Sequence, residues 1–265
     1  MKLHGQRIVI TGAGSGIGRA LLARLSTYSS QIVAADQDAV SLHEAIDEWA
    51  GGSARILAHV GDIGSAEGVD ALFARALAEF GGIDIFIANA GFAYYERFNQ
   101  TNWDRMAALF NVNVISPLYA LAKMRALHPT DPYMVVITAS AMSKMGLAGY
   151  ALYSASKAAL DRFAQAYRDE APPNGHLMLV YPISTRTRFF TAASEKSPAP
   201  VPWPSQSPEA VAAAIVRGIE RDARSVYPSR MFRIALMVNH LVPVLTIYRT
   251  AARRQFFQWS ARQKV

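Results

Sequence analysis

The chain has 265 residues, a length typical of one α/β domain, and a formal net charge of +7. It has no cysteine, which excludes disulfides, thiol catalysis and thiolate metal sites, and no metal site is predicted. Residues 1–10 hold no apolar stretch long enough for a signal core, so we expect a cytoplasmic protein.

Short apolar runs rich in β-branched residues alternate with helical patterns along most of the chain. They predict strands at 7–11, 31–35, 54–60, 83–88, 133–139, 176–181 and 225–227, and helices at 16–27, 38–50, 65–80, 101–127, 150–171 and 208–222. This alternation predicts an α/β fold with a Rossmann-like, doubly wound parallel sheet of about seven strands and helices on both faces. We assign residues 1–228 to the catalytic domain and residues 229–265 to a C-terminal helical extension of it.

A glycine-rich segment, Thr11–Gly18, connects the first predicted strand to the first predicted helix. Glycines allow a tight turn and close approach of the backbone to a pyrophosphate, and the helix N-terminus offers free N–H groups. This context predicts a dinucleotide site with contacts from Gly12, Ser15, Gly16, Ile17 and Gly18. Asp36 ends the second strand, where a carboxylate accepts hydrogen bonds from ribose hydroxyls and repels a 2′-phosphate.

Tyr153 and Lys157 lie four residues apart in a predicted helix, so both side chains project from one face. A nearby ammonium favours the phenolate, and we therefore expect the Tyr153 pKa to fall below its usual value of about 10. That shift would make Tyr153 a usable general acid and base.

Together the two motifs resemble the short-chain dehydrogenase/reductase family, in its single-domain branch, over about residues 5–228. Further segments resemble the family in the expected order. Asp62 and Ile63 match its adenine-contacting pair, and Asn89-Ala90-Gly91 matches its Asn-Ala-Gly turn, with Ala88 replacing the usual preceding Asn. Pro182 and Thr187 bound a segment that resembles a cofactor-binding loop of the family, in which Ile183 replaces the usual glycine.

The resemblance implies hydride transfer between a nicotinamide and a secondary alcohol or ketone, with four residues in catalytic roles. Tyr153 exchanges the hydroxyl proton, and Lys157 binds the nicotinamide ribose and lowers the Tyr153 pKa. Ser140, 13 residues before Tyr153, hydrogen-bonds the substrate oxygen. Asn113 holds a water in the proton path. A homodimer or homotetramer is expected.

The same resemblance favours NAD over NADP. Phosphate-binding members usually carry a basic residue in the glycine-rich turn or just after the Asp position, and here those places hold Ser15 and Gln37. Arg19 leaves NADP open. An NADPH-dependent ketone reductase and a non-catalytic nucleotide-binding regulatory protein are the alternatives, although the catalytic Tyr and Lys are both present.

The substrate side is predicted from apolar residues and from the segment 189–208, whose five prolines interrupt regular structure. The segment is either a lid over the pocket or a surface loop. The candidate lining residues favour a bulky apolar or aromatic substrate. They are Phe92, Tyr94, Tyr95, Met142, Met145, Leu147, Tyr150, Phe189, Phe190 and Trp203.

The C-terminal part of the chain concentrates positive charge. Residues 217–265 hold ten Lys or Arg and two Asp or Glu, and the rest of the chain is nearly neutral. Two apolar helical patterns, 229–241 and 243–260, are too interrupted by polar residues for a membrane span. We expect this extension to contact an anionic membrane surface, with Phe256, Phe257 and Trp259 partly buried in lipid, or an acidic protein or a second subunit. Packing against its own domain is the alternative. No motif supports nucleic-acid binding.

Overall fold

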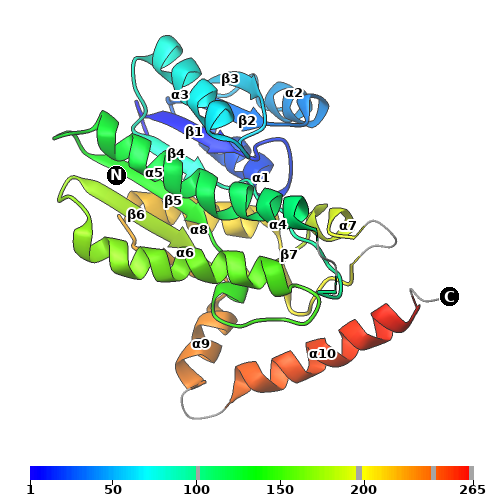
Figure 1. Cartoon of the computed structure of the whole chain (residues 1–265). Coiled ribbons are helices and arrows are strands. Elements are labelled where there is room, and N and C mark those ends of the chain that lie inside the picture. Colours follow the sequence, from blue (N-terminus) through cyan, green and yellow to red (C-terminus); the bar gives the residue numbers. More distant parts are fainter. Residues whose placement is uncertain (100–101, 195–198, 240–242, 263–265) are drawn as a thin grey trace.

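A single parallel sheet forms the centre of the computed structural model, which describes residues 1–99, 102–194, 199–239 and 243–262 (Figure 1). The strand order is β3-β2-β1-β4-β5-β6-β9. The strands are β1 (Arg7–Thr11), β2 (Gln31–Asp36), β3 (Arg55–Val60), β4 (Ile85–Ala88), β5 (Tyr133–Thr138), β6 (Gly175–Val180) and β9 (Ser225–Val226). The order reverses between β1 and β4, and such a switch point leaves a crevice at the carboxyl ends of the strands.

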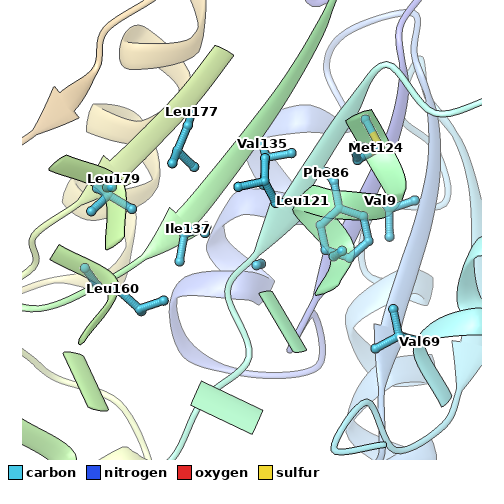
Figure 2. Close-up of a cluster of buried hydrophobic side chains, with 14 of the residues drawn as sticks. Val9, Val69, Phe86, Leu121, Met124, Val135, Ile137, Leu160, Leu177 and Leu179 are labelled. Carbon is cyan, nitrogen blue, oxygen red and sulfur yellow. The ribbon is translucent and has the colours of Figure 1, made fainter. Parts of the chain in front are cut away.

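Helices cover both faces of the sheet, which confirms the predicted fold class. They are α1 (Gly16–Leu25), α2 (Ala39–Asp47), α3 (Ala66–Phe80), α4 (Trp103–Phe110), α5 (Ser116–Leu127), α6 (Ala151–Glu170) and α8 (Pro208–Glu220). On one face, side chains of α3, α5 and α6 such as Val69, Leu121 and Leu160 pack on Val135 and neighbouring strand residues (Figure 2). On the other face, α1 and α8 pack together over the sheet. Burial on both faces explains why the strands are continuous apolar runs rather than alternating ones.

The predicted helix 101–127 is interrupted by a π-helical turn, Asn111–Ile115, and residues 100–101 lie outside the described part of the chain. Pro117 lies four residues after Asn113 and has no N–H to give the Asn113 carbonyl, so the α-helical pattern cannot pass through this point. In the described residues, Trp103–Leu127 is the one helical stretch long and apolar enough to cross a membrane. Its α5 part packs on α3 and on strands β4 and β5.

Short elements appear between β6 and α8 that the sequence did not predict. Two-residue strands β7 (Ser184–Thr185) and β8 (Ser205–Gln206) pair in parallel, and a short helix α7 (Phe189–Ala192) lies between them. Residues 195–198 of the predicted lid lie outside the described part.

The C-terminal extension forms two helices, α9 (Arg230–Val238) and α10 (Val244–Arg262), drawn in orange and red beyond α6 in Figure 1. One face of α10 packs on the body of the protein. Phe256 and Trp259 contact Tyr95, and the Arg97 Nε donates to Ser260 Oγ at 2.7 Å. Phe256 is 5 % exposed. The expectation that Phe256 and Trp259 enter lipid is therefore wrong, because both rings are used within the domain.

Candidate active site

The carboxyl ends of β1, β4 and β5 border a cavity of about 600 Å³. Most of the predicted cofactor and catalytic residues line it. They are Gly12, Ser15, Gly16, Ile17, Asp36, Asp62, Ile63, Asn89, Ala90, Gly91, Ser140, Tyr153, Lys157, Pro182 and Thr187. Gly18 and Asn113 are not part of the lining.

The glycine-rich loop forms a cradle that only glycine can line. Gly12 has a φ of +68°, and a Cβ on it would come within 2.9 Å of the Ala90 Cα. Gly16 has a φ of +52°, and a Cβ there would come within 2.9 Å of the Thr187 Cγ2. Ser15, at the N-cap of α1, makes no side-chain cap hydrogen bond, so N–H groups of the first helical turn remain for a ligand. These residues fit a dinucleotide pyrophosphate at the helix N-terminus.

Two predicted cofactor contacts have a different role in the structure. Gly18 lies behind the cavity, where a Cβ would overlap the Gly12 carbonyl oxygen, so its small size lets α1 pack on the loop. The Asn89 side chain donates to the main-chain oxygens of Thr11 and Gly12 at 3.2 and 3.3 Å and accepts from Thr138 Oγ1 at 3.3 Å. It joins the ends of β1, β4 and β5. Gly18 therefore has a packing role outside the cavity lining, and the Asn89 amide is already engaged within the protein.

Asp36 presents a fixed carboxylate at the adenine end of the cavity. Its Oδ2 accepts from the Gly14 N–H at 2.9 Å and its Oδ1 from the Asp38 N–H at 3.1 Å. Arg19, the cation that left NADP open, donates to Glu48 Oε2 through Nε at 3.0 Å and Nη2 at 2.8 Å. It does not line the cavity.

Arg188 is a cavity residue that the sequence analysis missed. Its Nη2 donates to Ser41 Oγ, in the first turn of α2, at 3.3 Å. The pKa of the Asp38 carboxyl is lowered, chiefly by hydrogen bonds from Ser41 and to a smaller extent by the Arg188 charge. Arg188 therefore brings a cation from the segment before α7 to the end of the cavity that holds Asp36. No motif marked it, because the contact joins residues 147 positions apart.

The predicted catalytic side chains Ser140, Tyr153 and Lys157 line the same cavity and are almost fully buried. Ser140 and Tyr153 are each 8 % exposed, and Lys157 is 3 % exposed. The Lys157 Nζ donates to the Thr138 carbonyl at 2.7 Å and lies 5.7 Å from the centre of the Tyr153 ring. The four-residue spacing thus places the pair together as predicted.

Their protonation differs from the prediction. Burial raises the pKa of Tyr153 to about 12, and a hydrogen bond with Ser140 opposes this shift only in part. Burial lowers the pKa of Lys157 to about 7. The expected fall in the Tyr153 pKa is therefore wrong for the protein without nucleotide. Desolvation dominates both groups, and a lysine that is readily neutral does little to favour a phenolate.

Asn113 lies in the π-helical turn, one layer behind the cavity surface. Its Nδ2 donates to the Phe92 carbonyl at 2.9 Å and to Ser156 Oγ at 3.2 Å, and its Oδ1 accepts from the Phe92 N–H at 3.1 Å. A Cβ on Gly91 would meet Asn113 Oδ1 at 3.0 Å and Lys157 Nζ at 3.4 Å, so the three residues lie together. The side chain is occupied, and any water that Asn113 holds must bind its main chain.

The substrate side of the cavity is largely apolar. Of the predicted lining residues, those that line it are Phe92, Met142, Met145, Leu147, Phe189, Phe190 and Trp203, together with Ile183. Tyr94, Tyr95 and Tyr150 do not, and that part of the prediction is wrong. Tyr95 and Tyr150 contact each other at 4.7 Å between ring centres inside a buried cluster, and the Arg105 guanidinium covers the Tyr94 ring at 3.6 Å.

The C-terminal helices complete the wall of the cavity, a role that the sequence analysis missed. The residues they contribute are Met231, Phe232, Ala235, Val244, Leu245 and Tyr248. The apolar stripes of the extension were visible in the sequence, but their periodicity does not tell which surface they cover.

Comparison with known proteins identifies relatives of both the sequence and the fold. Residues 6–198 match the family described as short chain dehydrogenase. A hydroxynaphthalene reductase-like protein of Metarhizium acridum is 30 % identical over 202 residues, covering 72 % of each chain. An uncharacterised oxidoreductase of Bacillus subtilis is 27 % identical over 256 residues, covering 92 % of this chain and 71 % of the relative.

Solved structures share the fold over nearly the whole chain. A short-chain dehydrogenase/reductase from Burkholderia phymatum in complex with NAD has a TM-score of 0.81 at 20 % identity, covering 93 % of this chain and 96 % of that one. A short-chain dehydrogenase from Sphingobium yanoikuyae in complex with NADPH has a TM-score of 0.77 at 22 % identity, with coverage of 90 % and 94 %. The match to the family spans most of the sheet and all four predicted catalytic positions, and on this basis the chain belongs to the short-chain dehydrogenases and is an oxidoreductase that uses a nicotinamide dinucleotide.

Proposed function

We propose that this protein transfers a hydride between NAD(H) and a secondary alcohol or ketone with a bulky apolar or aromatic body. One observation carries the proposal. Ser140, Tyr153 and Lys157 meet at one end of a cavity that has Asp36 at its other end and apolar side chains between α7 and α10. A single cavity can therefore hold the nucleotide and the substrate together.

The bound dinucleotide supplies hydride donation and acceptance, and the protein positions it and moves the proton. The N-terminus of α1 would hold the pyrophosphate, and the Lys157 Nζ would bind a ribose hydroxyl. In ketone reduction the Tyr153 hydroxyl donates its proton to the substrate oxygen, while Ser140 Oγ hydrogen-bonds the same oxygen. In alcohol oxidation the Tyr153 phenolate accepts that proton and becomes neutral, and a protonated Lys157 stabilises the phenolate before the transfer.

The preference for NAD is supported by charge at the ribose end. The Asp36 carboxylate repels a 2′-phosphate, and the pairing of Arg19 with Glu48 removes the cation that would offset it. Arg188 favours the second candidate, an NADPH-dependent reductase, because it brings a positive charge to the first turn of α2. The two groups therefore oppose each other in selecting the nucleotide.

The experiment is a calorimetric titration of NAD and NADP into the wild-type protein and two variants. We expect wild type to bind NAD more tightly. Asp36→Ala should narrow the difference in affinity between NAD and NADP, because the repulsion of the 2′-phosphate and the hydrogen bonds to the ribose are lost together. Arg188→Gln should widen that difference, because it removes the positive charge that favours NADP. Equal or tighter binding of NADP by wild type would reject the NAD preference and support the second candidate.

An apolar or aromatic substrate is supported by the lining and by the name of the Metarhizium relative, a hydroxynaphthalene reductase-like protein. A screen of secondary alcohols with NAD, followed by nucleotide absorbance, tests this assignment. Bulky aromatic alcohols should be oxidised faster than sugars or small hydroxy acids. Nucleotide binding without turnover of any alcohol or ketone would instead support a regulatory protein.

A further inference from the structure

The mouth of the cavity is bordered by exposed apolar side chains. On α9, Met231, Ile234 and Met237 are 51, 60 and 69 % exposed, and Trp203 in the proline-rich segment is 81 % exposed. Met231 and Trp203 also line the cavity. The apolar surface outside the protein is therefore continuous with the apolar wall inside the cavity.

Unpaired cations lie beside this surface. Residues 223–265 contain eight Lys or Arg and no Asp or Glu. Arg230 and Arg233 are exposed on α9, and Arg249, Arg253 and Arg254 are exposed on α10. Within residues 230–238 and 244–262, which the structure describes, no arginine forms an ion pair. Their charges are free for an external anion.

We infer that α9, the start of α10 and Trp203 form a docking surface for an anionic phospholipid bilayer, with the mouth of the cavity opening onto the lipid. Apolar side chains flanked by arginines are what an interfacial helix presents to headgroups and acyl chains. α9 has nine residues, far fewer than a membrane span needs, so the contact lies in the plane of the interface. We refer to this face as the docking face.

A second copy of the chain fits the docking face less well than lipid does. A symmetric contact would bring the same patch of both copies together, and Arg230 and Arg233 of one would approach those of the other. Residues 223–265 contain no Asp or Glu side chain that could pair with them. An anionic bilayer supplies the missing negative charge.

Binding to a bilayer also has a consequence for the substrate, and this step rests on the proposed function. An apolar alcohol or ketone concentrates in lipid, and a cavity that opens there takes it up without crossing water. The docking face itself does not depend on that step, because it is defined by exposure and charge alone.

Sedimentation with vesicles tests the docking face without any turnover. Wild-type protein should bind vesicles of phosphatidylcholine with 30 % phosphatidylglycerol, and should bind pure phosphatidylcholine much less. Each arginine near an anionic surface contributes about fivefold to binding, so Arg230→Gln/Arg233→Gln should weaken vesicle binding about 25-fold. High salt should have a similar effect on wild type.

Matched variants test whether vesicle binding depends on where the arginines lie or only on the total charge of the protein. Arg24→Gln/Arg162→Gln removes two exposed arginines elsewhere and should bind like wild type. Ile234→Ser/Met237→Ser should lose binding while keeping its fold and its nucleotide affinity, because neither residue lines the cavity. Equal losses in the two arginine variants, or no vesicle binding by wild type, would overturn the proposal.

Light scattering tests the alternative of a second copy. If the mass of the wild-type protein in solution falls to that of a monomer in Ile234→Ser/Met237→Ser, the face is a subunit contact and the proposal is wrong. An unchanged mass together with lost vesicle binding supports lipid. If the wild-type protein neither binds the nucleotide nor turns over a substrate, the proposed function is rejected, but the results on vesicle binding and on the mass in solution still test the docking face.

Fluorescence tests whether the cavity mouth faces the bilayer. Trp103 and Trp203 are similarly exposed, at 82 and 81 %, but only Trp203 lines the cavity. Spin-labelled lipid in the vesicles should quench wild type and Trp103→Phe, and should quench Trp203→Phe much less. Quenching that disappears in Trp103→Phe instead would place a different surface on the membrane and overturn the proposal.

Discussion

Burial of the Lys157 ammonium should cost stability, so we expect that removing its charge makes the fold more stable. Burial lowers its pKa from 10.5 to about 7. At about 1.4 kcal/mol for each pH unit, this difference sets a ceiling of about 5 kcal/mol on the cost of burying the ammonium. Lys157→Met also removes the hydrogen bond to the Thr138 carbonyl, which offsets about 1–3 kcal/mol. We expect a net gain of about 2–4 kcal/mol in the free energy of unfolding at pH 6.

The stability gained in Lys157→Met should decrease as the pH rises. Below pH 7 Lys157 is protonated in both the folded and unfolded states, and the folded state bears the full cost. Between pH 7 and 10.5 the unfolded state keeps a proton that the folded state has lost, so wild-type stability rises with pH. Above 10.5 the lysine is neutral in both states. The advantage of the variant should therefore be largest at pH 6 and shrink toward pH 10.

Urea unfolding followed by circular dichroism measures this difference, at one protein concentration and without nucleotide. Lys144→Met is the matched control. The Lys144 Nζ lies 2.7 Å from Asp161 Oδ1, and the Asp161 side chain is 4 % exposed. Its loss leaves a buried carboxylate without a cation and should destabilise the fold by about 3–5 kcal/mol. If Lys157→Met is also less stable than wild type at pH 6, by an amount that does not vary with pH, the reasoning is refuted.

Three further variants test separate parts of the site. Tyr153→Phe should lower kcat by roughly 10²–10⁴ while the Kd for NAD from a fluorescence titration stays near that of wild type, because the phenol moves a proton and does not anchor the nucleotide. Near-normal turnover would rule out this role. Gly18→Ala should reduce the free energy of unfolding by about 1–3 kcal/mol and weaken NAD binding, since its methyl group would overlap the Gly12 carbonyl and displace the loop. Thermal unfolding and NAD titration measure both effects, and a variant like wild type in each contradicts the packing argument. Tyr248→Ala should raise the KM for a bulky ketone about tenfold or more with little change in the Kd for NAD, because its ring lines the substrate side. A parallel rise in both constants would place Tyr248 at the nucleotide instead.

The sheet and the glycine-rich loop could be predicted because each is encoded over a few neighbouring residues. A strand buried on both faces must be a continuous apolar run, as in β1 and β5. The loop needs glycine at Gly12 and Gly16, where φ is positive and a side chain would strike the neighbouring chain. Such requirements leave a pattern in neighbouring residues that can be recognised without knowing any distant contact.

Features that depend on distant contacts were not visible in the sequence. The π-helical turn places the Asn113 side chain against Phe92 and Ser156, 21 and 43 residues away. Arg188 reaches Ser41 across 147 positions. The stripe on α10 showed that one face would be buried, but it did not show that Tyr248 would line the cavity.

The protonation of the catalytic pair combines both kinds of information. The four-residue spacing brings Tyr153 and Lys157 close together. That part of the prediction is confirmed, because the Lys157 Nζ lies 5.7 Å from the centre of the Tyr153 ring. Their pKa values depend instead on how much water surrounds them, and burial removes that water. The rings of Phe189 and Tyr150 lie beside Tyr153, with ring centres 5.4 and 6.3 Å from that of Tyr153. These rings come from segments on either side of α6. The pair therefore starts as a protonated phenol beside a lysine that is readily neutral, so Tyr153 is ready to act as an acid. Its action as a base requires the phenolate, which a protonated Lys157 favours.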